Sequence, residues 1–384
     1  MVSSWTQHEV LHPAIMNKPT TSAIKPETIQ KANLIKLAVD VHARSYMVVR
    51  QVDHAHPQPP QCMSPKQFVS WAAKQKQLAD RVVVCYESGP FGFVLARDLI
   101  AQGVQCLVMA AQQLDERHKR VQTDKLDAME ISSRLDRYLA GNSRALCIVK
   151  IPTLDQERQR SQARQRGQML KTRKQLEAQG RSLLVLNGYT GARSHWWKQP
   201  LWDKGQTLWP AAVVEMLARW RTVLLSLEEQ LQGLTRQLEA SVKEYLPASL
   251  PQLPVGVGAL TWVLLSRELL EWKRFRNRRQ VGSFTGLIAS ESTSGESKRQ
   301  GSITKVGNPR VRALLVELVW RLLQFQPDYY VVKNWRPWLA VGGSKSQRKK
   351  IVVAMARQCA VDLWRLATEQ TTAHKLGLKI ARAA

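Results

Sequence analysis

Four acidic residues in the first third of the chain have the type and spacing needed to hold divalent metal ions. Asp40 and Glu87 each lie at the end of an apolar, β-branched run, LIKLAVDV for Asp40 and RVVVCYE for Glu87. Asp124 and Asp127 are one turn apart in a predicted helix, so they point to one face of it. Two-metal phosphodiester chemistry needs hard oxygen ligands gathered closely, and Mg²⁺ prefers carboxylates and water. The set therefore predicts a magnesium site, with Mn²⁺ as an alternative ion.

Each acid also has a simpler interpretation. Asp124 and Asp127 could be ordinary first-turn residues that complement the dipole of their helix, and Glu87 could be a loop carboxylate after a strand. The metal interpretation is favoured because four acids follow one another on two strand ends and one helix start, which is a demanding pattern.

A second group of reactive side chains lies in residues 286–308, a segment rich in Ser, Thr and Gly. A serine hydroxyl becomes a nucleophile when its proton is removed and cations stabilise the charge that develops on the attacked phosphate. Ser294, which precedes Gly295, is the predicted nucleophile. The cations that could stabilise that charge are Lys298, Arg299 and Lys305. Two alternatives stay open: that Ser290, Ser292, Ser297 or Ser302 reacts, or that the hydroxyls only cap turns and bind phosphate oxygens.

The four acids require a fold in which strand ends and a helix start converge. The apolar patterns predict a strand hairpin, a helix, a strand, a helix, a strand and a final helix, in that order. Their ranges are 34–52 for the hairpin, then 65–79, 81–87, 91–102, 104–110 and 124–140. This order predicts a mixed α/β domain with an RNase H-like layout.

A long basic helix is predicted between residues 156 and 179. Its predicted contacts with nucleic acid are Arg158, Arg164, Lys171, Arg173 and Lys174. The same pattern is also that of a helix whose charged side chains are simply solvated.

Residues 211–246 carry a heptad repeat in which apolar residues recur every seven positions. The repeating positions are Leu217, Leu224, Leu231, Leu238 and Tyr245, with Trp220, Leu227 and Leu234 three residues after the first three. Such a seam packs against another helix, and the partner could be the basic helix of the same chain or a second subunit.

The C-terminal part begins with LPVGVG (253–258), a predicted tight turn that opens a helix and resembles the hairpin of helix-hairpin-helix modules. Backbone N–H groups of such a turn can bind a phosphate. Further helices are predicted around 309–326 and 346–370, so this part is mainly helical.

The charge of the chain points to a polyanionic partner. Lys and Arg number 57 against 30 Asp and Glu, a net charge of +27, of which residues 151–384 carry +21. Nucleic acid is the expected partner. The five scattered cysteines form no CxxC pair, which favours reduced thiols. No signal peptide or membrane-length apolar run is evident, so we expect a protein of the bacterial cytosol or nucleoid with no membrane partner.

Six ordered motifs resemble the DEDD-type transposases of the insertion-sequence 110 family, in particular its 1111 group. They are LAVDVH (37–42), CYESGP (85–90), TDKLDA (123–128), VKIPT (149–153), LPVGVG and GLIASESTSGESKRQGSITKVGN (286–308). The resemblance covers nearly the whole chain. One departure is Glu296, where many relatives have a second glycine after Ser-Gly.

The resemblance implies four parts: an N-terminal arm (1–33), a RuvC-like catalytic domain (34–152), a helical coiled-coil region (153–248) and a transposase domain with the serine (249–384). It implies that Asp40, Glu87, Asp124 and Asp127 bind Mg²⁺ and that the nucleophile is Ser294.

The implied partners are target and donor double-stranded DNA and a structured non-coding RNA, called a bridge or seeker RNA, that pairs with both. A homo-oligomer, dimer or tetramer, is also expected. Two other functions remain open, a Piv-type site-specific DNA invertase and a non-catalytic nucleic-acid-binding relative.

Overall fold

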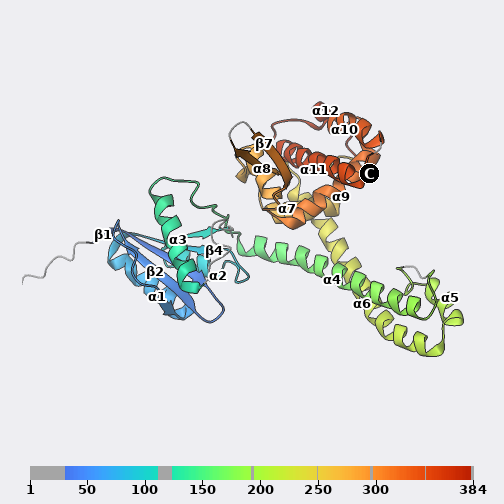
Figure 1. Ribbon diagram of the computed structural model, residues 1–384, viewed down its shortest axis with the longest axis horizontal. Coiled ribbons are helices and arrows are strands. Elements are labelled where there is room, and N and C mark those ends of the chain that lie inside the picture. Colours follow the sequence, from blue (N-terminus) through green and yellow to red (C-terminus); the bar gives the residue numbers. More distant parts are fainter. Residues whose placement is uncertain are drawn as a thin grey trace, which may run out of the picture. The chain divides into compact units, whose positions relative to one another are not determined.

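The computed structural model describes residues 31–110, 123–191, 194–248, 250–294, 297–341 and 343–381, with the backbone alone between 292 and 299. The expected N-terminal arm lies almost entirely outside these residues, and the first strand begins at Ala32. The chain divides after Ile151 into two compact units. Figure 1 shows their elements, and each unit is described by itself.

The first unit is a five-stranded mixed sheet with helices on both faces (Figure 1). Its strand order is β3-β2-β1-β4-β5, in which β1 is antiparallel to β2 and parallel to β4, and β5 is parallel to β4. The strands are β1 (Ala32–Val41), β2 (Tyr46–Val52), β3 (Gln61–Met63), β4 (Ala79–Glu87) and β5 (Gln105–Met109). The helices are α1 (Pro65–Lys74), α2 (Val94–Ala101) and α3 (Asp124–Leu139).

Alternation along the central strands sends their side chains to two different cores. Val39 and Tyr86 lie in the core that also holds Phe68 of α1 and Leu99 of α2. The intervening residues, such as Ala38 of β1, pack in a second core with the buried face of α3. Every second residue of β1 counted from Ala38, and every second residue of β4 counted from Cys85, therefore faces α3.

An ion pair between a buried lysine and a partly exposed aspartate fixes α3 to β1 near the C-terminal end of the helix. Lys36 is almost fully buried in the middle of β1, and its ammonium group pairs with Asp136 of α3. The same group donates a hydrogen bond to the carbonyl oxygen of Asp53 at 2.5 Å. A buried ammonium group needs such partners because desolvation otherwise disfavours its charge.

The predicted α/β architecture is confirmed, with differences at element ends. The helix predicted over 65–79 ends as a 3₁₀ turn at Gln77, because Ala79 already pairs with Ala32 as the first residue of β4. The short edge strand β3 was not predicted, because QCM is too short to show a period of two.

Within its described residues, the second unit is helical apart from one two-stranded sheet. Its first elements are α4 (Leu154–Leu186), α5 (Leu201–Leu208) and α6 (Ala211–Ala240). Then follow α7 (Ala259–Leu269), α8 (Arg278–Thr285), β6 (Ala289–Ser294), β7 (Ser297–Ile303), α9 (Pro309–Phe325), α10 (Tyr330–Ala340), α11 (Lys345–Ala367) and α12 (Ala373–Leu376). No helix in the described ranges is both long and apolar enough to cross a lipid bilayer.

The predicted heptad seam is present on α6, and its partner is the basic helix α4 of the same chain. The two helices run side by side as a long hairpin with α5 at its tip (Figure 1). Leu217, Leu224, Leu231 and Leu238 are buried on α6. The fifth position, Tyr245, falls in a 3₁₀ turn after the helix, so the helical seam ends at Leu238. The seam is therefore filled without a second subunit.

Replacement of Leu224 by alanine tests this packing. Leu224 is fully buried, so Leu224→Ala is expected to lower the free energy of unfolding of the second unit by about 2–5 kcal/mol. The neighbouring Leu225 is 42% exposed, and Leu225→Ala should change that free energy by no more than about 0.5 kcal/mol. Calorimetry of the full chain measures both, and equal effects of the two substitutions would contradict the α4–α6 pairing.

The predicted loop at 286–308 is instead a β-hairpin, β6–β7, which corrects the sequence interpretation. Its register pairs Ser294 with Ser297 and Ser292 with Arg299, with an irregularity between Ala289 and Glu291. The segment has no apolar alternation, so its strands gave no hydrophobic signal. The predicted helices around 309–326 and 346–370 correspond to α9 and α11, and α10 was not predicted.

Candidate metal and nucleic-acid site

The carboxyl ends of β1 and β4 place two of the predicted acids next to each other. The parallel register pairs Val39 with Tyr86, so Asp40 and Glu87 are the next residues along neighbouring strands. Asp40 is two residues after Ala38, and Glu87 is two residues after Cys85, so both lie on the face of the sheet that packs against α3. Asp124 begins α3, whose N-cap is Thr123, and Asp127 is one turn later. The sheet and the helix thus bring together acids that are up to 87 positions apart in the sequence.

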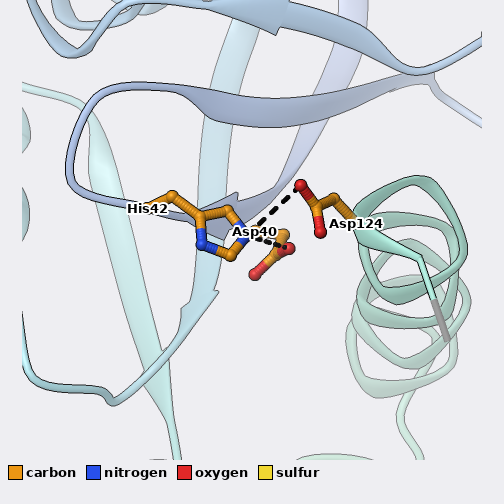
Figure 2. Close-up of side chains that lie close together, drawn as sticks. All are labelled: Asp40, His42 and Asp124. Atoms are coloured by element: carbon orange, nitrogen blue, oxygen red, sulfur yellow. Dashed lines mark hydrogen bonds and ion pairs between the residues drawn. The ribbon is translucent and has the colours of Figure 1, made fainter.

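His42 joins two of these acids, as Figure 2 shows. Its Nε2 atom lies 3.0 Å from a carboxylate oxygen of Asp40 and 3.5 Å from one of Asp124. One possible ligand atom from each residue lies within 4.8 Å of the others, a spacing that a single cation could bridge. Asp40 is half-buried, while His42 and Asp124 are exposed and open to ligands from solution.

The electrostatics of Glu87 connect it to the same cluster. Partial burial raises the pKa of Glu87, and the negative charges of Asp40 and Asp127 raise it further. Arg134 of α3 acts in the opposite direction. The carboxylates therefore repel one another more than the nearby arginine compensates, and a bound cation would relieve this repulsion.

His42 is the residue of this cluster that was missed from the sequence. It belongs to the LAVDVH motif, and a spacing of two from Asp40 at a strand end puts both side chains on the same side of the sheet. That spacing was the available signal. It was weak because β1 ends at Val41 and the backbone N–H of His42 already bonds to Ser45 in the turn, where alternation need not continue.

Ser294 is the last residue of β6. Gly295 and Glu296 lie outside the described residues, and the side chains of Ser294, Lys298 and Arg299 are not described. Lys305 follows the hairpin and is exposed. Ser290 donates its hydroxyl to the carbonyl oxygen of Ser302 at 3.0 Å, so one competing serine has a structural role within the hairpin.

The five cations predicted on the basic helix fall into two groups. Arg158, Lys171 and Lys174 are exposed on α4, although Arg158 lies 3.4 Å from Asp155. The other two are used inside the unit. Arg164 makes a two-pronged bond to Glu268 of α7, at 2.8 and 2.9 Å, and Arg173 pairs with Glu228 of α6 at 2.5 Å.

The carboxylate of Glu268 is buried and accepts hydrogen bonds from two residues. Besides Arg164, Asn308 donates its side-chain amide to Glu268 at 2.8 Å. Burial opposes ionisation of Glu268, but the hydrogen bonds from Arg164 and Asn308 outweigh it, so its pKa is lowered. Asn308 also caps α9, so one carboxylate links α4, α7 and the start of α9.

Substitution separates the two groups of cations. Arg164→Ala leaves a buried carboxylate short of its strongest partner and is expected to lower the free energy of unfolding by about 2 kcal/mol. Lys171→Ala should leave stability unchanged and reduce the salt dependence of nucleic-acid binding by about one unit of slope. Thermal unfolding and salt titration of binding measure these effects. The assignment fails if Arg164→Ala leaves thermal stability unchanged.

The predicted turn at LPVGVG is present before α7. The backbone N–H of Val257 donates to the carbonyl oxygen of Pro254 at 2.9 Å, and Gly256 adopts a φ of 87°, which favours glycine. Gly258 is the N-cap of α7. A Cβ atom at Gly258 would lie 3.2 Å from the guanidinium of Arg321, so a cation of α9 lies close to the turn.

Comparison with known proteins agrees with these features. Residues 250–331, which contain the turn, the β6–β7 hairpin and α9, match the family model described as the transposase IS116/IS110/IS902 family. The chain is 26% identical over 310 residues to putative transposase y4rJ of Sinorhizobium fredii, covering 74% of this chain and 76% of the relative. It is 27% identical over 309 residues to putative transposase y4qE of the same organism, covering 77% and 69%. It is 24% identical over 283 residues to the transposase for insertion sequence element IS1111A of Coxiella burnetii, covering 72% and 75%.

Proposed function

We propose that this chain, which belongs to the IS116/IS110/IS902 family of transposases, cuts and rejoins DNA through a metal-dependent serine mechanism directed by a guide RNA. The observation that carries the proposal is the convergence of Asp40, Glu87 and the acidic start of α3 at one edge of the sheet. The strand order β3-β2-β1-β4-β5, with α3 packed on β1, supports an RNase H-like, RuvC-like assignment for the first unit.

The residues at this edge fit a divalent cation. Asp40, Glu87, Asp124 and Asp127 would hold it through carboxylate oxygens, the donors that Mg²⁺ and Mn²⁺ prefer. The repulsion that raises the pKa of Glu87 is what a cation would remove. When bound, the ion would stabilise negative charge on the phosphate and lower the pKa of a bound hydroxyl group. His42 holds the carboxylates of Asp40 and Asp124 close together through its Nε2 atom.

The proposed nucleophile is the hydroxyl of Ser294. Its oxygen forms a bond to the phosphorus of a DNA phosphodiester, the proton leaves the hydroxyl, and the bond from phosphorus to the 3′ oxygen breaks. The phosphate stays joined to the serine and to the 5′ end of the strand downstream of the cut, and the departing 3′ oxygen takes up a proton to become a free 3′ hydroxyl. Attack by a 3′ hydroxyl of the other DNA on that link then restores the phosphodiester and releases the serine.

The charge distribution supports the proposed nucleic-acid partners. Residues 151–384 carry most of the net charge of +27, and α4 keeps Arg158, Lys171 and Lys174 exposed. Binding one RNA and two DNA duplexes requires many phosphate contacts, each of which makes affinity fall with salt. An oligomer remains an expectation, and because α4 fills the heptad seam it would use another surface.

The direct test is to purify the full chain with the RNA that accompanies it and to sequence that RNA. Recovery of one structured RNA, together with joining of matching DNA in Mg²⁺ and none in EDTA, supports the proposal. Joining that needs no RNA points to an invertase that recognises fixed DNA sites. Binding without any Mg²⁺-dependent cleavage points to a non-catalytic relative.

A further inference from the structure

A strongly cationic surface that the proposed function does not use lies on α10 and the start of α11. Residues 329–361 contain seven Lys or Arg and no Asp or Glu. All seven are exposed, and six of them lie on α10 or in the first six residues of α11: Lys333, Arg336, Lys345, Arg348, Lys349 and Lys350. Lys333 lies 3.6 Å from Asp328, whereas the other five have no acidic partner among the residues that the structure describes. Their charges are therefore available to an anionic ligand.

The position of four of these cations is unfavourable for the isolated protein. Lys345, Arg348, Lys349 and Lys350 occupy the first six residues of α11, at the positive end of the helix dipole. Lys345 and Lys349 are also one turn apart, a spacing at which like charges repel. By contrast, the first turns of α3 and α4 both contain acidic residues. An anion bound at this end of α11 would convert the repulsion into attraction.

An exposed tryptophan accompanies the charges. Trp338 of α10 is 66% exposed, whereas Trp335 and Leu339 of the same helix pack on the core of the unit. Trp338 and Lys345 are seven positions apart in the sequence, so the two lie at most about 25 Å apart. A flexible nucleic-acid strand of a few nucleotides can span that length. An exposed indole beside cations provides a face on which an unpaired base can stack.

We infer that Trp338 and the cations at the start of α11 bind an unpaired strand of nucleic acid, with the indole stacked on a base and the cations on neighbouring phosphates. A duplex covers the faces of its bases, so Trp338 favours single-stranded segments. The inference deepens the proposed function and rests on it only for the source of the strand, which is either the guide RNA or opened DNA.

The test uses the full chain without Mg²⁺ and measures its binding to labelled nucleic acids by fluorescence anisotropy. The ligands are a 12-nucleotide RNA, a single-stranded DNA of the same sequence, and the corresponding DNA duplex. A length of about 12 nucleotides is within the site size of single-strand binding folds. Trp338→Ala is expected to weaken binding of both single strands by roughly five- to 100-fold and of the duplex far less. Trp338→Phe should retain most of the affinity. Trp320→Ala is the matched control, because Trp320 of α9 is 54% exposed and should give no change.

A double substitution, Lys349→Gln with Lys350→Gln, tests the cations separately. It should reduce the slope of log affinity against log salt by about 1.4 for single strands and raise the melting temperature, because repulsion at the start of α11 falls. If Trp338→Ala weakens the binding of single-stranded RNA and DNA equally, the surface accepts an unpaired strand of either kind. If it weakens the binding of RNA more, the surface is assigned to the guide RNA. Both results support the inference.

Three results overturn the inference. They are unchanged single-strand affinity in Trp338→Ala, an equal loss on the duplex, and displacement of RNA by polyglutamate at equal charge. Asp40→Asn should bind single strands as the unmodified chain does, so loss of catalysis and loss of this surface are distinguishable. The inference can fail while the proposed function stands, and the reverse also holds.

Discussion

Asp40→Asn and Glu87→Gln are each expected to reduce DNA cleavage by about 1,000-fold or more while leaving nucleic-acid binding nearly intact. Loss of a metal ligand removes several kcal/mol of charge stabilisation from the transition state, whereas binding depends on cations elsewhere. Both substitutions keep the size of the side chain, and asparagine keeps an oxygen that can accept from His42. Gel assays of cleavage, with calorimetric titration of Mn²⁺, measure the two effects.

The matched control lies on the same strand. Asp80 is an exposed acid near the start of β4, and Glu87 is at its end, so Asp80→Asn removes one charge from the other edge of the sheet. It should leave cleavage within about twofold of the unmodified protein, in line with a surface substitution remote from the chemistry. Full activity in both Asp40→Asn and Glu87→Gln would contradict the metal site.

Ser294→Ala is expected to abolish the covalent protein–DNA species and to reduce strand joining to background. No other group can form the phosphoserine bond if Ser294 is the nucleophile, so the loss should exceed about 1,000-fold. The measurement is denaturing electrophoresis of reactions with labelled DNA, in which the adduct migrates with the protein.

Two neighbouring serines control for effects on the hairpin. Ser292→Ala is two residues away on β6 and should keep adduct formation. Ser290→Ala removes the hydrogen bond to Ser302, so it reports any loss caused by hairpin distortion alone. Adduct that persists in Ser294→Ala and disappears in Ser292→Ala would transfer the role of nucleophile to Ser292.

The first unit was largely predictable from the sequence because its signals are local. The apolar runs that end at Asp40 and Glu87 define buried strands, and Thr123 marks the start of α3 by capping it. Convergence of the acids follows from the parallel pairing of β1 and β4. His42 was missed because its role depends on how closely α3 approaches the turn after β1. That distance cannot be inferred from the spacing of residues in the sequence.

The second unit was less predictable because its partners are not marked by hydrophobicity. The heptad repeat of α6 identified a seam, but α4 is strongly polar, and the buried residues it contributes include Ala163, Glu177 and Gly180. Polar contacts such as Arg173 with Glu228 and Arg166 with Thr235 complete the interface. Arg164 and Arg173 therefore have the sequence character of phosphate ligands and yet serve the packing of the unit.

The ion pair between Lys36 and Asp136 has a consequence for how activity can be lost. Asp136 is twelve residues after Asp124, about 18 Å along α3, so the far end of the helix helps determine where its first turn lies. Lys36 thus influences the placement of Asp124 and Asp127 without touching either. A related chain that has lost Lys36 could keep all four acids of the site and still be inactive. The presence of the four acids is therefore an incomplete criterion for an active transposase.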